Sequence, residues 1–391
     1  MRSWTRRALR HPRGMAAVLL AVLLPVVVGF AALSVDTAVV SVARAQMSTA
    51  ADAAALAGAL QLATENRVQG GTNLSAELTA ANTQAVALAT ANFVLGATPV
   101  VNPNIANNSG GQIMVGYLDP NNPQSTLDSS SASTTLFNSV QVQMFRDSSH
   151  GGAVPTIFAQ LMGFHGTNVT VSSTATAQTY SLNGFQATGS LNANLLPIVL
   201  DKTTWQTMMA GQSTDQFTYN AATNTVTSGP DGIYESQLYP VSSGSPGNWG
   251  TIKVGVSNNS TSTLSAQILY GITPAQLATF PNSTIQLDQT QSPPSITFQG
   301  NPGISAGIKS ALTSIIGNPV AVPIYDENGG NGNNAWYRVI AFQPARILSV
   351  NFQGNPKYVI IQPALLNDAT GIPGTAQSWT SGGLISVQLT R

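Results

Sequence analysis

The sequence predicts an α+β protein, with an N-terminal transmembrane helix and helical stalk followed by a β-rich extracytoplasmic region. Three observations lead to this prediction. Five arginines in the first 13 residues precede an uncharged apolar run, Met15–Val35. An alanine-rich pattern with helical spacing continues from Thr37 to about Ala63. Beyond Gly96, short segments rich in Val, Ile and Thr alternate with turns rich in Gly, Pro and Asn, as in proteins built from short strands.

The apolar run Met15–Val35 has the length of a membrane span. It contains 21 residues. At about 1.5 Å of rise per residue, such a helix covers the roughly 30 Å hydrocarbon thickness of a bilayer. The nearby basic residues lie on its N-terminal side, since none follows until Arg44. This bias places the N-terminus in the cytoplasm and everything from Asp36 onward outside.

A cleaved secretory signal is the competing interpretation of this region. A basic start, an apolar stretch and the small residues Ala43-Arg44-Ala45 imitate the three parts of a signal peptide. Signal cores usually contain about 7 to 15 apolar residues, however. The core here is longer, and the small residues lie well beyond Val35 inside a helical pattern. We therefore prefer the membrane anchor.

Composition excludes several classes of function. There are 15 basic and 15 acidic residues, and because five of the basic ones precede position 14, the rest of the chain is mildly acidic. Such a surface does not attract a polyanion, so we expect no nucleic-acid partner. Cysteine is absent, so the outer region must rely on a packed core rather than on disulfides. No Gly-x-x-x-x-Gly-Lys-Ser/Thr motif occurs, so we expect no nucleotide.

The stalk after the span is dense in alanine between Ala50 and Ala59. Two interpretations stay open. Small residues allow a partner helix to approach closely, as at interfaces between membrane helices, or they provide high helix propensity and nothing more. After a break at 69–73, helical spacing resumes over Ser75–Phe93, which predicts a helical hairpin.

A strand, a short helix and a second strand are predicted next. Apolar and polar residues alternate over Ser139–Phe145 and over Asn168–Thr174. Between them, Pro155–Phe164 places four large apolar residues on one side of a short helix. We therefore divide the chain into a basic cytoplasmic leader (1–14), the transmembrane helix (15–35), a helical stalk or hairpin (36–95), a first α+β region (96–183) and a β-rich C-terminal domain (184–391).

The C-terminal domain contains regularly spaced apolar segments that predict a sandwich or a barrel-like sheet. These segments are Leu195–Leu200, Ile252–Val256, Leu264–Ile272, Val320–Ile324, Trp336–Phe342, Ile347–Phe352 and Tyr358–Ile361. Two helices are predicted to cross the sheet: Pro274–Phe280 after a Thr273 cap, and Ile304–Ile316 ending at Gly317. Whether this half forms one domain or two stays open.

The N-terminal residues resemble a known family. The basic leader, the apolar span ending in Phe30-Ala31-Ala32-Leu33-Ser34-Val35-Asp36 and the alanine-rich stretch 43–59 are similar to the N-terminal domain of TadG-like Flp (tight adherence) pilus-assembly proteins. The following strand, short helix and strand, ending at Ala177, are also similar, though less distinctively. The resemblance implies an inner-membrane component of the pilus machinery with its bulk in the periplasm.

Two departures limit what the resemblance implies. Some members of the family carry a von Willebrand A domain whose metal site begins Asp-x-Ser-x-Ser, but the segment here reads Asp128-Ser129-Ser130-Ser131-Ala132. Pilins of this system are cleaved after a glycine and carry glutamate at the fifth mature position, whereas the fifth residue after Gly14 is Leu19. We therefore assign no metal site and no processing as a pilin by that route.

Three motifs suggest chemistry without completing a site. Gly303-Ile304-Ser305-Ala306-Gly307 matches the Gly-x-Ser-x-Gly nucleophile elbow, but in that fold the histidine base follows the serine, and this chain has only His11, His150 and His165, all upstream. His150 and His165 lack the further ligands of a zinc site. The polar segment 326–334 is typical of a calcium loop, but its twelfth position is Tyr337. We predict no catalytic, cofactor or metal-binding residue.

Three hypotheses about function follow. The first is a membrane-anchored, non-enzymatic component of Flp/Tad-type pilus assembly or cell-envelope attachment, whose N-terminal helix contacts other pilus-assembly membrane subunits. The second is a surface adhesin or carbohydrate-binding envelope protein, suggested by aromatic residues that we expect to be exposed: Trp249, Trp336, Tyr337 and Trp379. The third, an extracytoplasmic enzyme, is disfavoured by the shortage of histidine and charge.

Overall fold

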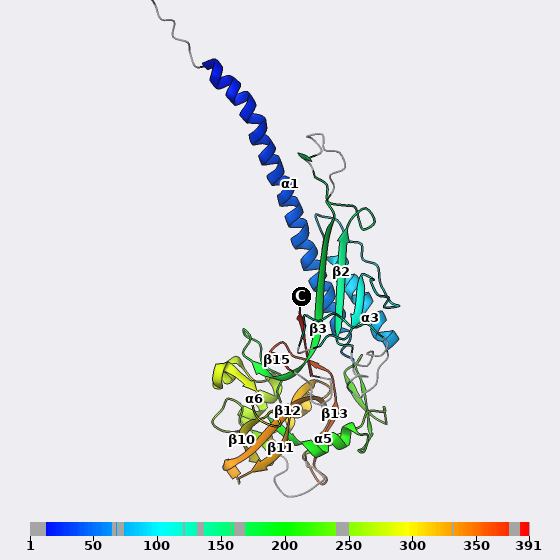
Figure 1. Cartoon of the computed structure of the whole chain (residues 1–391). Coiled ribbons are helices and arrows are strands. Elements are labelled where there is room, and N and C mark those ends of the chain that lie inside the picture. The colour runs from blue at the N-terminus through cyan, green and yellow to red at the C-terminus, as the bar shows by residue number, and fades with distance from the viewer. Residues whose placement is uncertain are drawn as a thin grey trace, which may run out of the picture.

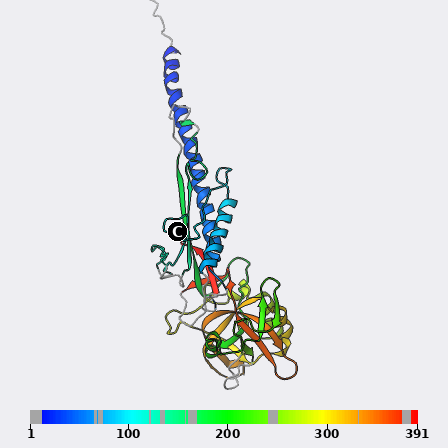
Figure 2. The same ribbon diagram turned by 90° about the vertical axis from the view of Figure 1, so that its right-hand side faces the viewer.

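A long helix leads into a sheet, and the sheet leads into a barrel-like body in the computed structural model of the chain (Figure 1). The structure describes residues 13–64, 68, 74–119, 122–130, 137–156, 158–159, 169–239, 250–330, 332–374 and 384–390. In two perpendicular views the N-terminal end of the helix extends away from the rest of the molecule (Figures 1 and 2). The α+β class predicted from the sequence is confirmed.

The predicted span and the predicted stalk form one continuous helix, α1 (Arg13–Leu60), of 48 residues. At about 1.5 Å per residue, a helix of this length is about 72 Å long. Pro25 lies inside it without ending it. The predicted hairpin partner is α3 (Leu74–Ala91), which packs against the C-terminal part of α1. The predicted hairpin is therefore present.

The first sheet lies against the C-terminal part of α1. Its order is β1 (Ile113–Gly116), β2 (Ser139–Arg146), β3 (Val171–Gln186), β16 (Leu384–Leu389) and β14 (Leu366–Asn367), and β15 (Gly371–Gly374) and β9 (Thr284–Gln286) also pair with β3. The strand predicted over Ser139–Phe145 is confirmed as β2. The strand predicted over Asn168–Thr174 begins at Val171 and continues to Gln186, while most of the helix predicted over Pro155–Phe164 lies outside the described residues.

Strand β3 joins the two halves of the molecule. Its first half pairs with β2, and its second half pairs with β16, β15 and β9 from the C-terminal half of the sequence. The boundary predicted between residues 183 and 184 therefore falls inside a strand. Phe185 of β3 packs edge-to-face on Phe342 of the barrel at 5.3 Å between ring centroids, so the sheet and the barrel share a hydrophobic cluster.

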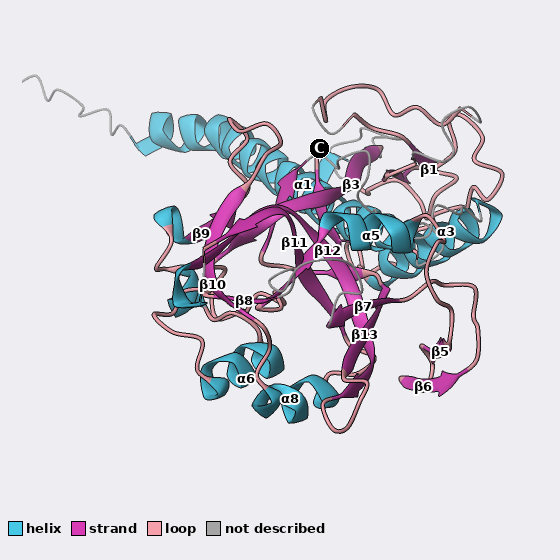
Figure 3. Cartoon of the chain, turned by 90° about the horizontal axis from the view of Figure 1, so that it is seen from below, coloured by secondary structure: helices cyan, strands magenta, loops and turns pink. Residues whose placement is uncertain are grey.

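The second sheet closes into a barrel, one of the two forms predicted (Figure 3). Its order is β10 (Ile296–Pro302), β8 (Gly250–Ile252), β4 (Ile198–Asp201), β11 (Pro319–Gly329), β12 (Ala335–Asn351), β13 (Tyr358–Pro363) and β7 (Ser236–Tyr239). Closure occurs because the first part of β12 also pairs with β10. The segments predicted as Trp336–Phe342 and Ile347–Phe352 belong to this one long strand, and a separate hairpin consists of β5 (Phe217–Asn220) and β6 (Thr225–Ser228).

Short helices cover the barrel. They are α5 (Lys202–Met209), α6 (Thr261–Tyr270), α7 (Pro274–Leu277) and α8 (Lys309–Ser314), with 3-10 turns η2 (Pro281–Ser283), η3 (Ala306–Ile308) and η4 (Gly332–Asn334). The predicted Thr273 cap is confirmed as a capping box with Gln276. The helix predicted over Ile304–Ile316 is present as η3 followed by α8.

Two predicted strands differ in the structure. Of Ile252–Val256, only Ile252 belongs to a strand, as the last residue of β8. Leu264–Ile272 was expected to be a strand, but most of it is helix α6. The side chain of Ser260 accepts a hydrogen bond from the Thr263 amide and caps the helix. Leu264 and Ile268, four residues apart, are then buried on one face. The N-cap and the four-residue spacing favour a helix, and they outweigh the apolar content of the segment, which had suggested a strand.

Candidate functional site: the exposed half of the N-terminal helix

The N-terminal half of α1 exposes large apolar side chains along its length. Leu20, Val22, Phe30 and Leu33 are between 62% and 68% exposed, and Val35 is 44% exposed. The helix is long and apolar enough to cross a membrane, and almost none of its most apolar window is buried inside the protein. A core helix of a soluble protein would bury such a surface. The exposed half of α1 therefore requires an apolar environment that the described part of the chain does not supply.

The hydroxyl groups near the C-terminal end of this surface bond to their own helix. The side chains of Ser34, Thr37 and Ser41 each donate a hydrogen bond to the carbonyl four residues earlier, at 2.8 Å. Such bonds satisfy a hydroxyl without water. They make this end of the helix compatible with a bilayer interface.

The alanine-rich half of α1 packs inside the protein. Ala43, Ala50, Ala54 and Ala59 are fully buried, in one cluster with alanines of α3 and apolar residues of β1, β2 and β3. A Cβ at Gly58 would lie 3.0 Å from Val140 Cγ1, 3.3 Å from the Ala81 carbonyl oxygen and 3.4 Å from Ala85 Cβ. The small residues thus bring α1 close to α3 and β2 of the same chain. The interpretation of this face as a surface for a partner subunit is wrong.

At the junction of the two halves, α1 contacts the loop between β2 and β3. The carboxylate of Asp36 accepts hydrogen bonds from the backbone amides of Ala159, at 2.9 Å, and Phe158, at 3.3 Å. Asp36 is only 7% exposed. A groove of about 380 Å³ lies between the loop residues and α1 residues from Val26 to Asp36. The loop therefore lies beside the apolar span and not only beside the stalk.

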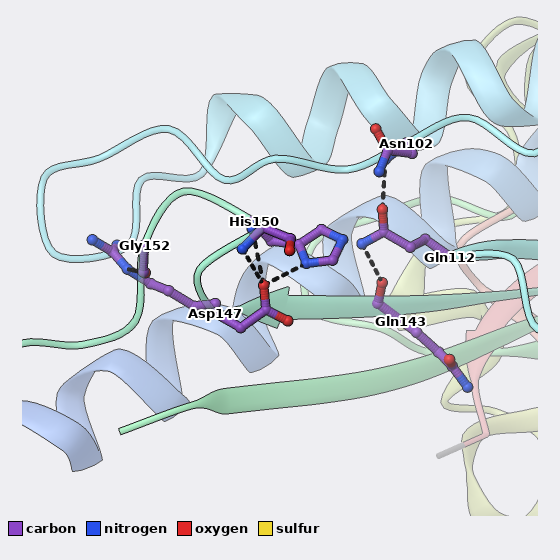
Figure 4. A network of polar contacts seen from close by, with 8 residues as sticks. Asn102, Gln112, Gln143, Asp147, His150 and Gly152 are labelled. Carbon is purple, nitrogen blue, oxygen red and sulfur yellow. Dashed lines mark hydrogen bonds and ion pairs between the residues drawn. The ribbon is translucent and has the colours of Figure 1, made fainter. Parts of the chain in front are cut away.

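The base of this loop is fixed by a network of polar contacts (Figure 4). Asp147 Oδ1 accepts hydrogen bonds from the Ser149 amide at 2.8 Å, the His150 amide at 3.0 Å and His150 Nδ1 at 2.8 Å. The bond from His150 is the main reason that the pKa of the Asp147 carboxyl is lowered. The Arg146 guanidinium donates to the carbonyls of Val94 and Gly152. Strand β2 is thereby tied to the turn after α3 at the point where the loop begins.

Farther along the loop, its two sides pair with each other. Val154 and Val169 exchange two backbone hydrogen bonds of 3.0 Å. Gln112 connects the neighbouring segments by accepting from the Asn102 amide at 2.7 Å and donating to the Gln143 carbonyl at 3.3 Å (Figure 4). The described parts of the loop thus include a paired base and the contact of Phe158 and Ala159 with α1.

Comparison with protein families gives one match. Residues 14–61 match the family described as putative Flp pilus-assembly TadE/G-like. This stretch is similar to a TadE/G-like pilus-assembly domain. This match confirms the resemblance found in the sequence, and its bounds nearly coincide with those of α1. No match was found among curated proteins or among solved structures.

The barrel lies outside the TadE/G-like match, so its candidate residues are judged on geometry. Ser305 is exposed, accepts a hydrogen bond from the Gly307 amide at 3.3 Å and lies 3.2 Å from the Thr261 hydroxyl. These contacts belong to the start of η3. His150 contacts Asp147 at the base of the loop, in the other half of the molecule, whereas His11 and His165 lie outside the described residues.

The possible metal ligands from the sequence have other contacts. Both carboxylate oxygens of Asp326 accept from Arg338, at 2.7 and 2.8 Å, and Arg338 also pairs with Glu327 at 2.8 Å. These residues lie where β11 and β12 approach their connecting turn. Asp128 accepts from the Ser130 amide at 2.9 Å, while Ser131 and Ala132 lie outside the described residues. Among the residues that the structure describes, no three His, Asp or Glu side chains gather as a metal site.

The aromatic residues that suggested a carbohydrate-binding surface do not form one within the described residues. Tyr337 is 1% exposed and packs edge-to-face on Tyr325 inside the barrel. Burial raises the pKa of Tyr337 to about 12. The expectation that Tyr337 is exposed is therefore wrong, and Trp336 is only partly exposed. Trp249 and Trp379 lie outside the described residues.

Sequence reasoning missed the contact between Asp36 and the loop, although Asp36 marks the end of the span. The one signal in the sequence was an acidic residue directly after an apolar run. The same pattern is expected when the acidic residue is simply exposed to water. Its partners, Phe158 and Ala159, are more than 120 positions away in the sequence. No local pattern predicts such a pair.

Proposed function

We propose that this chain is a membrane-anchored, non-enzymatic component of Flp/Tad-type pilus assembly or cell-envelope attachment. The observation that carries the proposal is that the TadE/G-like match coincides with α1, whose N-terminal half is apolar and mostly exposed. A helix of this kind is stable in lipid, where its backbone bonds are satisfied internally. The proposal assigns the span to Met15–Val35 and the membrane to the inner (cytoplasmic) membrane.

The charges at the two ends of the span support an orientation. Arg2, Arg6, Arg7, Arg10 and Arg13 precede the span, and no basic residue follows it until Arg44. Basic residues are retained on the cytoplasmic side. The proposal therefore places the N-terminus in the cytoplasm, and the sheet and the barrel in the periplasm.

The exposed half of α1 is the surface proposed for other membrane subunits of the pilus machinery. The alanine-rich half is occupied by α3 and the first sheet, so a partner helix would meet residues 17–35. Ala17, Ala21 and Ala31 are exposed within that stretch, and small residues favour close approach of helices in membranes. We propose no nucleotide and no nucleic acid as ligands.

The proposed absence of enzymatic activity is supported by the contacts of the motifs considered above. Ser305 takes part in the turn that starts η3, and Asp326 is paired with Arg338. Neither arrangement provides an activated nucleophile or a bound electrophile. The proposed role is attachment and assembly, with the barrel presented to the pilus or to the cell wall.

Deletion of the gene followed by complementation tests this function. Deletion is expected to reduce surface pili or adhesion, and the full chain is expected to restore them. A chain in which residues 1–35 are replaced by a cleaved signal peptide should reach the periplasm but fail to restore pili. Normal piliation in the deletion strain would reject the proposal.

The same assay separates attachment from catalysis. Ser305→Ala removes the one hydroxyl that matches a nucleophile motif, and it is expected to complement as well as the native chain. Loss of piliation by Ser305→Ala, at normal protein abundance in the membrane, would contradict the non-enzymatic role.

A further inference from the structure

The β2–β3 loop lies beside the part of α1 that the proposed function places in lipid. Phe158 and Ala159 share one groove with Val26, Phe30 and Leu33. At about 1.5 Å of rise per residue, Phe30 lies about 9 Å along the helix from Asp36, and Val26 about 15 Å. That second distance is roughly half of the 30 Å hydrocarbon thickness. The groove thus covers the outer half of the predicted span.

The arginines at the N-terminal end of the span limit how far α1 can slide through the bilayer. Sliding α1 outward, so that the groove leaves the lipid, would bring Arg13 and then Arg10 into the hydrocarbon. Charged residues are strongly disfavoured there. It would also expose Val26, Phe30 and Leu33, which are between 49% and 68% exposed in the protein alone, to water. The loop, rather than the helix, has to adapt to the membrane.

The contact with Asp36 makes such a position chemically possible. In lipid, every backbone polar group needs a hydrogen-bond partner within the protein, and Phe158 and Ala159 lie in a helical segment. The Asp36 carboxylate accepts from the amides of both Phe158 and Ala159. The charge of Asp36 is in turn stabilised by hydrogen bonds at the outer boundary of the span. The side chains next to these amides are apolar, apart from Asp36 itself.

From this arrangement we propose that Phe158 and Ala159, between β2 and β3, form a second membrane contact, in which Phe158 enters the outer leaflet beside α1 and lipid acyl chains fill the groove between them. The inference rests on the proposed membrane anchor. It adds that the periplasmic body is attached to the bilayer at two points, one helical and one in the loop. The ordered base of the loop, with the Asp147–His150 turn and the Val154–Val169 pair, then holds the sheet at a fixed orientation to the membrane.

Spin labelling of the full chain in liposomes tests the proposal directly. The sequence contains no cysteine, so each introduced cysteine is a unique label. Phe158→Cys and, separately, Ala159→Cys place the label on the loop. Leu24→Cys is the reference inside the span, and Thr223→Cys, on the exposed turn between β5 and β6, is the reference in water. Collisions with oxygen, which concentrates in lipid, are compared with collisions with a water-soluble nickel chelate.

The expected result is a shift of the loop labels toward oxygen, away from the value at Thr223 and toward the value at Leu24. Labels at both loop positions that match Thr223, with Leu24 in lipid, would overturn the second contact and leave the anchor intact. A label at Leu24 that matches Thr223 would overturn the anchor and with it the inference. Two loop positions are used so that misfolding of one variant does not decide the result.

Asp36 provides a second test within the same liposomes. Asp36→Ala removes the acceptor for the Phe158 and Ala159 amides, and the label at position 159 is expected to lose its shift toward oxygen. Ser34→Ala is the matched control, because the Ser34 hydroxyl bonds only to the carbonyl of Phe30 among its described contacts. An unchanged oxygen shift in Asp36→Ala would show that Asp36 does not hold the loop at the membrane.

Discussion

Gly58→Leu is expected to loosen the packing of α1 on the rest of the protein. A Cβ at this position already lies 3.0 Å from Val140 Cγ1, tighter than ordinary contact, and 3.3 to 3.4 Å from two atoms of α3. Leucine adds three further carbons to that closed space, and overpacking of this kind usually costs about 1–3 kcal/mol. Replacing a helical glycine returns up to about 1 kcal/mol of helix propensity. Contacts on three sides of the site place the overpacking cost in the upper part of its range, about 2–3 kcal/mol, so the net loss should be about 1–2 kcal/mol.

Hydrogen exchange of the full chain in detergent measures this loss. A change of about 1–2 kcal/mol in opening free energy corresponds to roughly 5- to 30-fold faster exchange. The acceleration is expected in α3 and in residues 50–60 of α1. The matched control is Ala45→Leu, an exposed position on the same helix, which should change the free energy by less than about 0.5 kcal/mol. Equal exchange in the two variants would refute the packing of the alanine-rich face inside the chain.

Three further predictions concern the sheet, the loop and the barrel. Ending the chain at Gly374 removes β16, which pairs with Ala177–Ser181 of β3. At about 1 kcal/mol for each lost backbone hydrogen bond, the free energy needed to open β3 should fall by roughly 2–5 kcal/mol. Unchanged proteolysis of β3 would contradict this prediction. The pKa of Asp147 is lowered by its His150 contact, so the turn is stabilised at pH values above the usual pKa of Asp and loosens as the pH falls through the lowered pKa. In His150→Ala, the faster exchange of the Ser149 amide should therefore begin at a higher pH. If exchange begins at the same pH in both proteins, the contact does not stabilise the turn. Arg338→Ala removes the partly exposed ion pairs with Asp326 and Glu327 and should lower the free energy of unfolding only slightly. A large loss in urea unfolding would mean that these pairs are more important than their exposure indicates.

Local patterns in the sequence predicted the elements whose determinants are local. The apolar run and its arginine flank predicted the exposed half of α1, and alternation predicted β2. Thr273 and Gln276 form the capping box expected at the start of α7. In each of these cases, residues within a few positions of one another decide the structure.

Contacts between distant residues could not be read from the same patterns. An alanine-rich helix has the same appearance whether α3 and a sheet of its own chain or another subunit covers it. The return of β16 to pair with β3 joins residues about 200 positions apart, so the domain boundary suggested by composition divides a strand. The bond from Asp36 to the β2–β3 loop is of the same kind. These pairings follow from tertiary packing, which overrides local preference.

The most direct test of the central claim is the accessibility of single cysteines on the two sides of the membrane. Spheroplasts expressing Ser3→Cys or Thr223→Cys would be treated with a maleimide that cannot cross the membrane. The anchor at Met15–Val35 predicts labelling of Thr223→Cys in intact spheroplasts, labelling of Ser3→Cys only after lysis, and retention of both chains in carbonate-washed membranes. Labelling of Ser3→Cys from outside, or release of the full-length chain by carbonate, would contradict the account.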